Sequence, residues 1–541
     1  MLFPVRIKWA SGLLLLILAA SCLHHGVDLS WVSWREADWQ SRSGQLQAAE
    51  LKFESREAEI ADALEKNGPI FVDWPKPQLA FVFSGEMDGY IEPCGCAGLE
   101  NQKGGLKRRH TFLKKLAADG WPVVAFDMGG QIRRFGPQAD IKYRFAIQAL
   151  TTLGYQAIGL GIRELQLDAN YLAYVLSNFE GAANPVISAN VTVINPALGL
   201  TSRYRVIEIA GKKIGVTALL GKKHQTALQN SPDIAWLEPA QALREVLPDL
   251  LAEQCDLLTL LVHADLDEAT DLAKQFPQFQ LVATTGGAET PPNRLISIKE
   301  SPTGEPLSYL IEAGHKGQYV TVIGVYDDPQ EPVRLQRVPL DHRFEDDAAM
   351  QELLVDYQDE LKTNGLSGLG LSSTKHPTDS FVGSAACADC HTAADEQFHN
   401  TPHAHATQTL VDLDPPRQYD PECLSCHATG WNPQEYFPYA SGFQGLKETP
   451  HLSDNGCENC HGPGASHVAA ESGEAEVSED ELERLRTRMR LEIVENEGNK
   501  KGQEIETAVV VNMCLKCHDE DNSPEFDFQE YWPQVEHYEE D

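Results

Sequence analysis

Short apolar runs recur along residues 76 to 340 and alternate with longer amphipathic stretches. The runs are LAFVF at 79–83, PVVAFD at 122–127, AIGLG at 157–161, LLTLLVHA at 257–264 and LVATT at 281–285. Runs of this length suit buried strands, and the stretches between them, such as LKRRHTFLKKLAADG at 106–120, have helical spacing. Buried strands that alternate with helices predict an α/β domain.

The pattern outside this domain predicts amphipathic helices and a linker. A charged helical spacer is expected within residues 23 to 75, and a helix followed by the Gly/Ser-rich tract NGLSGLGLSSTKHPTDS is expected within 341 to 380. The apolar face of that second helix consists of Ala349, Leu353, Leu354, Tyr357 and Leu361.

A further helix is expected to begin at a capping box formed by Ser478 and Glu481 and to run to Gly498. Its apolar stripe consists of Leu482, Leu485, Met489 and Ile493.

The first 22 residues have the pattern of an export signal. Arg6 and Lys8 precede an apolar run from Leu13 to Ala20 that is too short to span a bilayer comfortably. The small residues before Cys22 resemble a bacterial lipoprotein cleavage site, after which Cys22 would carry the lipid; the alternative is an uncleaved anchor helix. Both alternatives predict a periplasmic or cell-surface protein that is anchored to a membrane.

Charge narrows the classes of partner. The 541 residues include 44 basic and 80 acidic side chains, which give a net charge of -36. This charge opposes binding to nucleic acid and favours cationic partners.

Eight of the twelve cysteines fall into four C-x-x-C-H motifs, namely Cys387-Cys390-His391, Cys423-Cys426-His427, Cys457-Cys460-His461 and Cys514-Cys517-His518. Two thiols at this spacing form thioethers to one haem, and the following histidine becomes the proximal iron ligand. Paired Cys-x-x-Cys units also build zinc sites, but zinc has no use for histidine at the same adjacent position every time. The sequence therefore predicts four covalently bound c-type haems.

The runs PECLSCHATGW, NGCENCHGPGASH and MCLKCHDEDNSPEFDFQEYW resemble the tetrahaem cytochrome c-552/c-554 family over residues 381 to 541. The resemblance implies a mostly α-helical, loop-rich domain in which haems pack closely, most irons have two histidine ligands and electrons pass along the stack. The region has few aliphatic runs, so we expect the porphyrins to supply apolar surface around which the chain packs.

Spare histidines are candidates for the distal ligands. His403, His467 and His537 are preferred, ahead of His405, His451 and His399. His467 follows a Gly-Pro-Gly bend and is expected to reach the iron of a neighbouring motif. An iron without a distal ligand would be five-coordinate and able to bind a small molecule.

The α/β domain, over residues 76 to 340, resembles the metallophosphoesterase domain of the 5'-nucleotidase family. The blocks that carry the resemblance are FSGEMDGYIEPCGC, GGLKRRHTFLKKL, DMGG, GLGIRE, VHAD, TTGGAE and EAGHKGQYV. The resemblance implies two metal ions that activate a water molecule. In this chain, however, most positions of the metal ligands carry other residues: Glu86-Met87-Asp88 for Asp-x-His, Gly130 for the bridging aspartate, Ile162-Arg163 for Asn-His and Gly287-Ala288-Glu289 for His-x-His.

Of the family's ligands only His263 is retained, so a hydrolytic two-metal centre is not expected. Glu86, Asp88 and His263 remain candidates for one divalent cation. Cys94 and Cys96 have three alternatives, which are metal binding, pairing with another cysteine and the free thiol, whereas Cys255 is expected to be a buried thiol.

These observations favour an exported, membrane-anchored tetrahaem electron-transfer protein, rather than an enzyme, with a degenerate phosphoesterase domain as scaffold. The expected partner is a redox protein or a quinone-linked electron donor or acceptor. Two alternatives remain: a haem enzyme that acts on a small nitrogen or sulfur compound at an open iron, and a nucleotide phosphohydrolase with a redox module.

Overall fold

The computed structural model describes residues 55–93, 103–134, 136–179, 184–229, 231–300, 306–371, 373–491, 509–520, 522–523 and 525–537. The chain divides into two units, residues 1–61 and residues 62–541. The predictions for Cys22, Cys94, Cys96, Ile493 and Gly498 lie outside the described residues. Within the described ranges, no helix combines the length and the apolar character that crossing a membrane requires.

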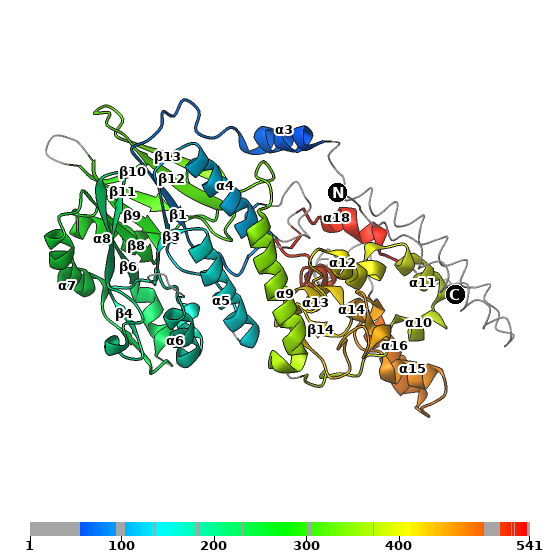
Figure 1. Cartoon of the computed structure of the whole chain (residues 1–541). Coiled ribbons are helices and arrows are strands. Elements are labelled where there is room, and N and C mark those ends of the chain that lie inside the picture. The colour runs from blue at the N-terminus through cyan, green and yellow to red at the C-terminus, as the bar shows by residue number, and fades with distance from the viewer. Residues whose placement is uncertain are drawn as a thin grey trace, which may run out of the picture. The chain divides into compact units, whose positions relative to one another are not determined.

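Two β-sheets form the centre of the α/β domain (Figure 1). The five-stranded sheet has the order β13 (Val333–Pro339), β12 (Tyr319–Val325), β1 (Leu79–Ser84), β2 (Val123–Asp127) and β3 (Tyr155–Ile158), and β1, β2 and β3 are parallel. The six-stranded sheet has the order β10 (Ile296–Glu300), β11 (Pro306–Glu312), β9 (Leu281–Thr284), β8 (Leu257–His263), β6 (Lys212–Leu220) and β5 (Tyr204–Ile209). Short strands β4 (Val191–Val193) and β7 (Ile234–Trp236) pair separately.

Helices cover both outer faces of this sandwich. The helices α4 (Leu106–Ala118), α5 (Pro137–Thr152) and α9 (Ala348–Gly368) lie on one side, and α7 (Pro239–Ala252) and α8 (Leu266–Gln275) lie on the other (Figure 1). The inner faces meet at Phe81, Phe83 and Phe126, which have no exposed surface. Each such side chain contributes about 1.5–3 kcal/mol of burial free energy, so these apolar runs specify the sandwich.

Most of the predicted strands are confirmed, with one shift. The run at 157–161 was expected to be a strand, but β3 ends at Ile158. The glycines that follow form a loop because a Cβ atom on Gly129 would lie 2.3 Å from the amide nitrogen of Gly161. Two backbones that approach this closely exclude side chains at that point.

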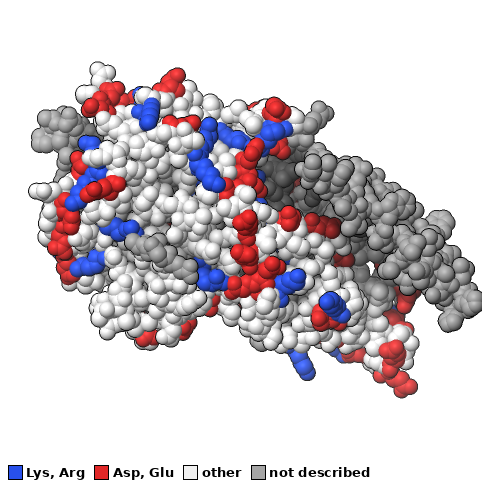
Figure 2. All heavy atoms as spheres, viewed as in Figure 1, with Lys and Arg blue, Asp and Glu red and all other residues white. Residues whose placement is uncertain are grey.

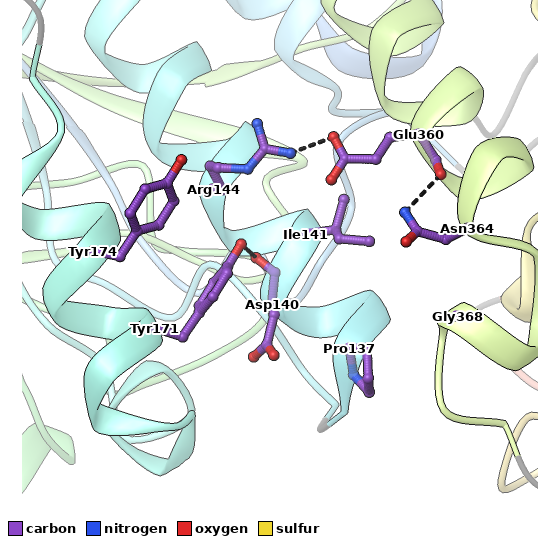
Figure 3. A pocket seen from close by; sticks show the side chains of 9 residues that line it. All are labelled: Pro137, Asp140, Ile141, Arg144, Tyr171, Tyr174, Glu360, Asn364 and Gly368. Carbon is purple, nitrogen blue, oxygen red and sulfur yellow. Dashed lines mark hydrogen bonds and ion pairs between the residues drawn. The ribbon is translucent and has the colours of Figure 1, made fainter.

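The helix predicted between the two domains is observed as α9. Its buried apolar residues, Met350, Leu353, Leu354, Tyr357 and Leu361, pack into the α/β core. Arg144 of α5 forms an ion pair with Glu360 of α9, beside a cavity of about 360 Å³ that is also lined by Tyr171 and Tyr174 of α6 (Ala169–Ser177) (Figure 3). The helix is therefore part of the α/β domain's packing.

The C-terminal region consists of short helices and loops. Its helices are α10 (Ser384–Ala388), α11 (Thr392–His399), α12 (Ala406–Asp412), α13 (Pro421–His427), α14 (Cys457–His461), α15 (Ala465–Glu471), α16 (Glu479–Met489) and α18 (Phe528–Tyr531). A two-stranded sheet of β14 (Trp431–Asn432) and β15 (Phe437–Pro438) lies between α13 and α14 in the sequence.

Helix α16 begins as predicted and ends early. The Ser478 side chain accepts a hydrogen bond from the amide of Glu481, as a capping residue does. The helix was expected to reach Gly498 but ends at Met489, where Arg490 turns to an extended conformation with ψ 138°. The carbonyl oxygen of Met489 accepts a 2.6 Å hydrogen bond from Nδ1 of His461, which satisfies one of the carbonyls left free at a helix end.

Candidate functional site

The C-x-x-C-H motifs lie on short helical turns. The second and third motifs lie within α13 and α14, the first spans α10 and the residues that follow it, and the fourth continues from a helix at residues 509–514. In a helical turn, positions i, i+3 and i+4 share one face. Both thiols and the imidazole of a motif are therefore presented on one side, as attachment of one flat porphyrin requires.

The motif histidines are oriented through Nδ1. His427 donates to the carbonyl oxygen of Ala406 over 2.7 Å, and His461 donates to that of Met489 over 2.6 Å. Nδ1 of His518 lies 3.1 Å from Oγ of Ser523. A proton on Nδ1 leaves the lone pair on Nε2, so the ring is prepared to bind iron through Nε2.

Three motif histidines each face a second histidine. The ring centres are 6.4 Å apart for His391 and His467, and 6.0 Å apart for His518 and His403. The third pair, His461 and His537, has ring centres 5.7 Å apart. Two imidazoles on opposite sides of one metal ion, each with a nitrogen about 2 Å from it, have centres about 6 Å apart. Each pair therefore has the separation at which both imidazoles would bind one iron.

These pairs contain the three preferred distal candidates. His467 faces the histidine of the first motif although it follows the third, as expected of a ligand that reaches a neighbouring iron. Burial, followed by the nearby histidines, lowers the pKa of His403 to about 4, and burial also lowers the pKa of His467. Both rings are neutral at pH 7, which is the form that binds metal.

The other candidates are placed differently. His399 is exposed and lies 3.5 Å from Asp395 in an ion pair. His405 lies near Asp454, and His451 is exposed in the short turn Pro450–Leu452.

The motifs are neighbours in an order that differs from their order in the chain. The thiol of Cys387 lies beside that of Cys457, and the thiol of Cys426 lies beside that of Cys517. The charge of Cys514 acts on Cys460. The spatial order is therefore first, third, fourth and second, which is a continuous path through the region.

The second candidate site lies at the carboxyl ends of parallel strands in the α/β domain. Glu86 follows β1, and His263 ends β8; Nε2 of His263 lies 3.4 Å from Oε1 of Glu86. Burial, followed by repulsion from the neighbouring Glu86, raises the pKa of Asp88 to about 7. The structure thus brings the three weak metal candidates together. Among the described residues, however, no group of three or more His, Cys, Asp or Glu is arranged to hold a metal ion.

Carboxylates occupy the space beside two glycines in this site. A Cβ on Gly130 would lie 2.8 Å from Oε2 of Glu86, and a Cβ on Gly287 would overlap the carboxylate of Glu312. Glu312 ends β11 and is the first residue of the block EAGHKGQYV, but the resemblance gave it no role as a ligand or as a neighbour of Gly287. His224 is also missed by sequence reasoning, although its ring centre is 5.1 Å from that of His263.

Asp127 has become part of a buried network. It accepts hydrogen bonds from Ser84, from the amide of Gly129 and from Gln131. The guanidinium of Arg109, which has 1% exposed surface, also donates to Ser84. Hydrogen bonds and a buried cation thus satisfy this carboxylate.

Both candidate regions are similar to known proteins. A family model described as cytochrome c554 and c-prime matches residues 386–462, which contain the first three motifs. Cytochrome c-554 of Nitrosomonas europaea is 33% identical over 97 residues, 16% of this chain and 39% of that protein. The snake venom 5'-nucleotidase of Gloydius brevicauda is 25% identical over 243 residues, 44% of this chain and 38% of that protein. A 5'-nucleotidase precursor from Thermus thermophilus superposes with a TM-score of 0.45 at 20% identity, over 61% of this chain and 68% of that chain.

The chain spans less than two fifths of the length of either curated relative. The sequence matches divide between the two regions, in agreement with the motifs on which each resemblance was based. The chain joins a 5'-nucleotidase-like, metallophosphoesterase-type α/β domain to a cytochrome-like haem region of the cytochrome c554 type.

Proposed function

We propose that the protein is an exported, membrane-anchored tetrahaem cytochrome c that transfers electrons, and that its α/β domain is a scaffold without two-metal hydrolysis. The observation that carries the proposal is the set of three histidine pairs, each of which joins a C-x-x-C-H histidine to a histidine from elsewhere in the chain. When bound, haem iron supplies one-electron chemistry without proton transfer.

The protein's residues have three tasks in this function. The cysteines of each motif would hold a haem at a fixed place, and the paired imidazoles of three motifs would bind its iron and exclude other ligands. The Ala406 and Met489 carbonyls fix the rings of His427 and His461. The neighbouring order of the motifs supports a path for electrons from one end of the region to the other.

The scaffold role of the α/β domain rests on what replaces the family's metal ligands. Glycine at 130 and 287 supplies no ligand atom, and the space beside each glycine is filled by a carboxylate from another element. Arg163 stands where the family has an imidazole ligand, and its charge acts on His224 beside the site. A catalytically active phosphohydrolase would release phosphate from nucleotides in a metal-dependent reaction, and we expect no such release from this protein.

The proposed redox partner is a cationic protein, or a quinone-linked donor or acceptor reached through a cationic surface. The net charge of -36 favours cationic partners. Figure 2 shows a band of acidic side chains over the position of α9, whose exposed acidic residues are Glu352, Asp356 and Asp359. Electron transfer to a basic partner should therefore slow as salt is added.

The first test counts haems and their axial ligands. Replacement of Cys457 and Cys460 by alanine should reduce four haems per chain to three, as measured by pyridine haemochrome absorbance against protein mass. Unchanged haem content in this double variant would refute the attachment. Ferric EPR and reduced carbon monoxide difference spectra of the unaltered protein then distinguish a pure electron carrier from an enzyme, since a high-spin haem that binds the gas would favour chemistry at an open iron.

Membrane attachment is tested at Cys22. In the Cys22→Ala variant, a lipoprotein would move from the membrane fraction to the soluble periplasmic fraction. A protein that stays in the membrane fraction would show that an N-terminal helix, rather than a lipid, is the anchor.

A further inference from the structure

The second C-x-x-C-H motif is held by side chains of the α/β domain. Its helix, α13, is capped by Asp420, which accepts a 3.0 Å hydrogen bond from the amide of Glu422. The same carboxylate accepts hydrogen bonds from Nε2 of Gln138 in α5, over 2.8 Å, and from Nε2 of Gln358 in α9, over 3.1 Å. The first turn of α13 is therefore fixed by two helices that belong to the packing of the α/β domain.

Lys142 of α5 makes the charged contact in this interface. Its Nζ lies 2.6 Å from Oε2 of Glu422, the residue that precedes Cys423, and only 7% of the lysine side chain is exposed. Burial lowers the pKa of Lys142, but the carboxylates of Glu422 and Asp420 outweigh burial and raise it overall. The ammonium is therefore charged beside the second motif.

Other charged groups face the same carboxylate. Arg134 lies 3.9 Å from Oε1 of Glu422, and Arg133 also acts on it, whereas Asp420 adds a second negative charge. The guanidinium of Arg134 lies 3.0 Å from the ring centre of Tyr436, which in turn lies close enough to Cys426 to feel its charge. Both thiols of the motif therefore adjoin residues that the α/β domain contacts.

We infer that Lys142 is a positioning residue for the second haem, which neutralises Glu422 beside the attachment site and so keeps that haem's reduction potential above the value the carboxylate alone would set. The inference rests on the proposed haem attachment at Cys423 and Cys426. It gives the phosphoesterase-like domain a specific task, since the domain sets the electronic properties of one member of the electron path.

The physical basis is the response of iron to nearby charge. Reduction adds one negative charge to the haem, so a nearby cation favours the reduced form and a nearby anion the oxidised form. Charges that are shielded from water are screened much less than surface charges. Loss of the buried ammonium should therefore lower the potential, and loss of the carboxylate, which leaves the ammonium uncompensated, should raise it.

The experiment is a potentiometric titration of the full-length holoprotein, followed by optical and EPR spectra that resolve the four haems. Lys142→Met should lower the midpoint of one haem by about a tenfold change in its oxidised-to-reduced ratio, which is 59 mV for one electron. Glu422→Gln should raise the midpoint of the same haem. Lys142→Arg keeps the positive charge and should therefore have the same midpoint as the unaltered protein. A purely structural role would not produce shifts of opposite sign.

Lys213→Met is the matched control. Lys213 forms a 2.9 Å ion pair with Glu253 inside the α/β domain, so its loss also breaks a lysine–glutamate pair but should leave all four potentials unchanged. Four haems per chain with no shift in either Lys142→Met or Glu422→Gln would overturn the inference, as would equal shifts of all haems or the same shift in the control. Absence of a haem from Cys423 and Cys426 in the unaltered protein would instead defeat the proposed function on which the inference rests.

Discussion

The α/β domain and the C-terminal region differ in what holds them together. In its described residues, the α/β domain buries three hydrophobic clusters, one between its two sheets and one beneath the helices on each outer face. In the described part of the C-terminal region, seven buried residues form one hydrophobic cluster: Phe381, Leu410, Leu424, Ala428, Trp431, Phe443 and Leu452. A chain segment with so small a core is marginally stable by itself. The difference indicates that the second region needs its cofactors to fold, whereas the first does not.

The largest expected effect follows from producing the chain without haem attachment. Amide protons in α13 and α14 should then exchange at rates close to those of an unfolded chain, because the porphyrins that complete the core are missing. Amides in β1, β2 and β8 should remain protected, since their core is made of protein. Hydrogen exchange with mass spectrometry measures both regions in one sample. Equal protection of the two regions in the haem-free chain would show that the comparison is wrong.

A smaller effect should follow from loss of one distal ligand. In His467→Ala, one additional haem should become high-spin and bind carbon monoxide, because His391 would be left as the single imidazole at its iron. His399→Ala is the matched control, since His399 lies in the same region but is exposed and paired with Asp395. Identical ferric EPR spectra for His467→Ala and the unaltered protein would contradict the assignment of this pair.

The same comparison explains what the sequence predicts well. The apolar runs of the α/β domain predict its strands because a core made of protein is encoded in local hydrophobicity, and only the run at 157–161 is displaced. In the C-terminal region, the motifs predict the attachment residues and the spare histidines supply the candidate ligands. The sequence does not show which histidine faces which motif, because the pairs join residues far apart, such as His461 and His537.

Contacts between distant elements account for the rest. The last carbonyl of helix α16, that of Met489, accepts a hydrogen bond from His461, and no residue near Met489 in the sequence signals this contact. Glu312 reaches the space beside Gly287 from another strand, and Lys142 reaches the second motif from a helix 280 positions earlier. Motif spacing describes residues that are close in the sequence, whereas these contacts join residues that are far apart in it, so the sequence alone does not predict them.

The smallest expected effect concerns the carboxylates of the α/β site. Asp88 has its pKa raised to about 7 by burial and by Glu86, so the folded chain holds this proton more tightly than the unfolded chain. The sign follows from linkage: stability falls as the pH rises from about 4 to about 7 and is constant above that range. Asp88→Asn, which cannot ionise, should therefore stabilise the α/β domain at pH 8 by about 1–2 kcal/mol, a value reduced to allow for partial exposure of the side chain.

Denaturant unfolding of the holoprotein at pH 5 and pH 8, followed by a signal from the α/β domain, measures this effect. Asp256→Asn is the control, and its effect on stability should have the opposite sign. A hydrogen bond from the Lys213 amide lowers the pKa of Asp256, so loss of the Asp256 carboxylate should destabilise the domain at pH 8. Unfolding measured with and without added divalent cations distinguishes a domain that binds no metal from a domain that binds one metal ion. If Glu86, Asp88 and His263 bound a cation, the metal would favour the ionised carboxylates, and Asp88→Asn would abolish a cation-dependent stabilisation of the unaltered protein. If Asp88→Asn stabilises the domain to the same extent with and without added cations, the result would support a site that binds no metal ion. Such a site lacks the metal ions on which phosphohydrolase chemistry depends.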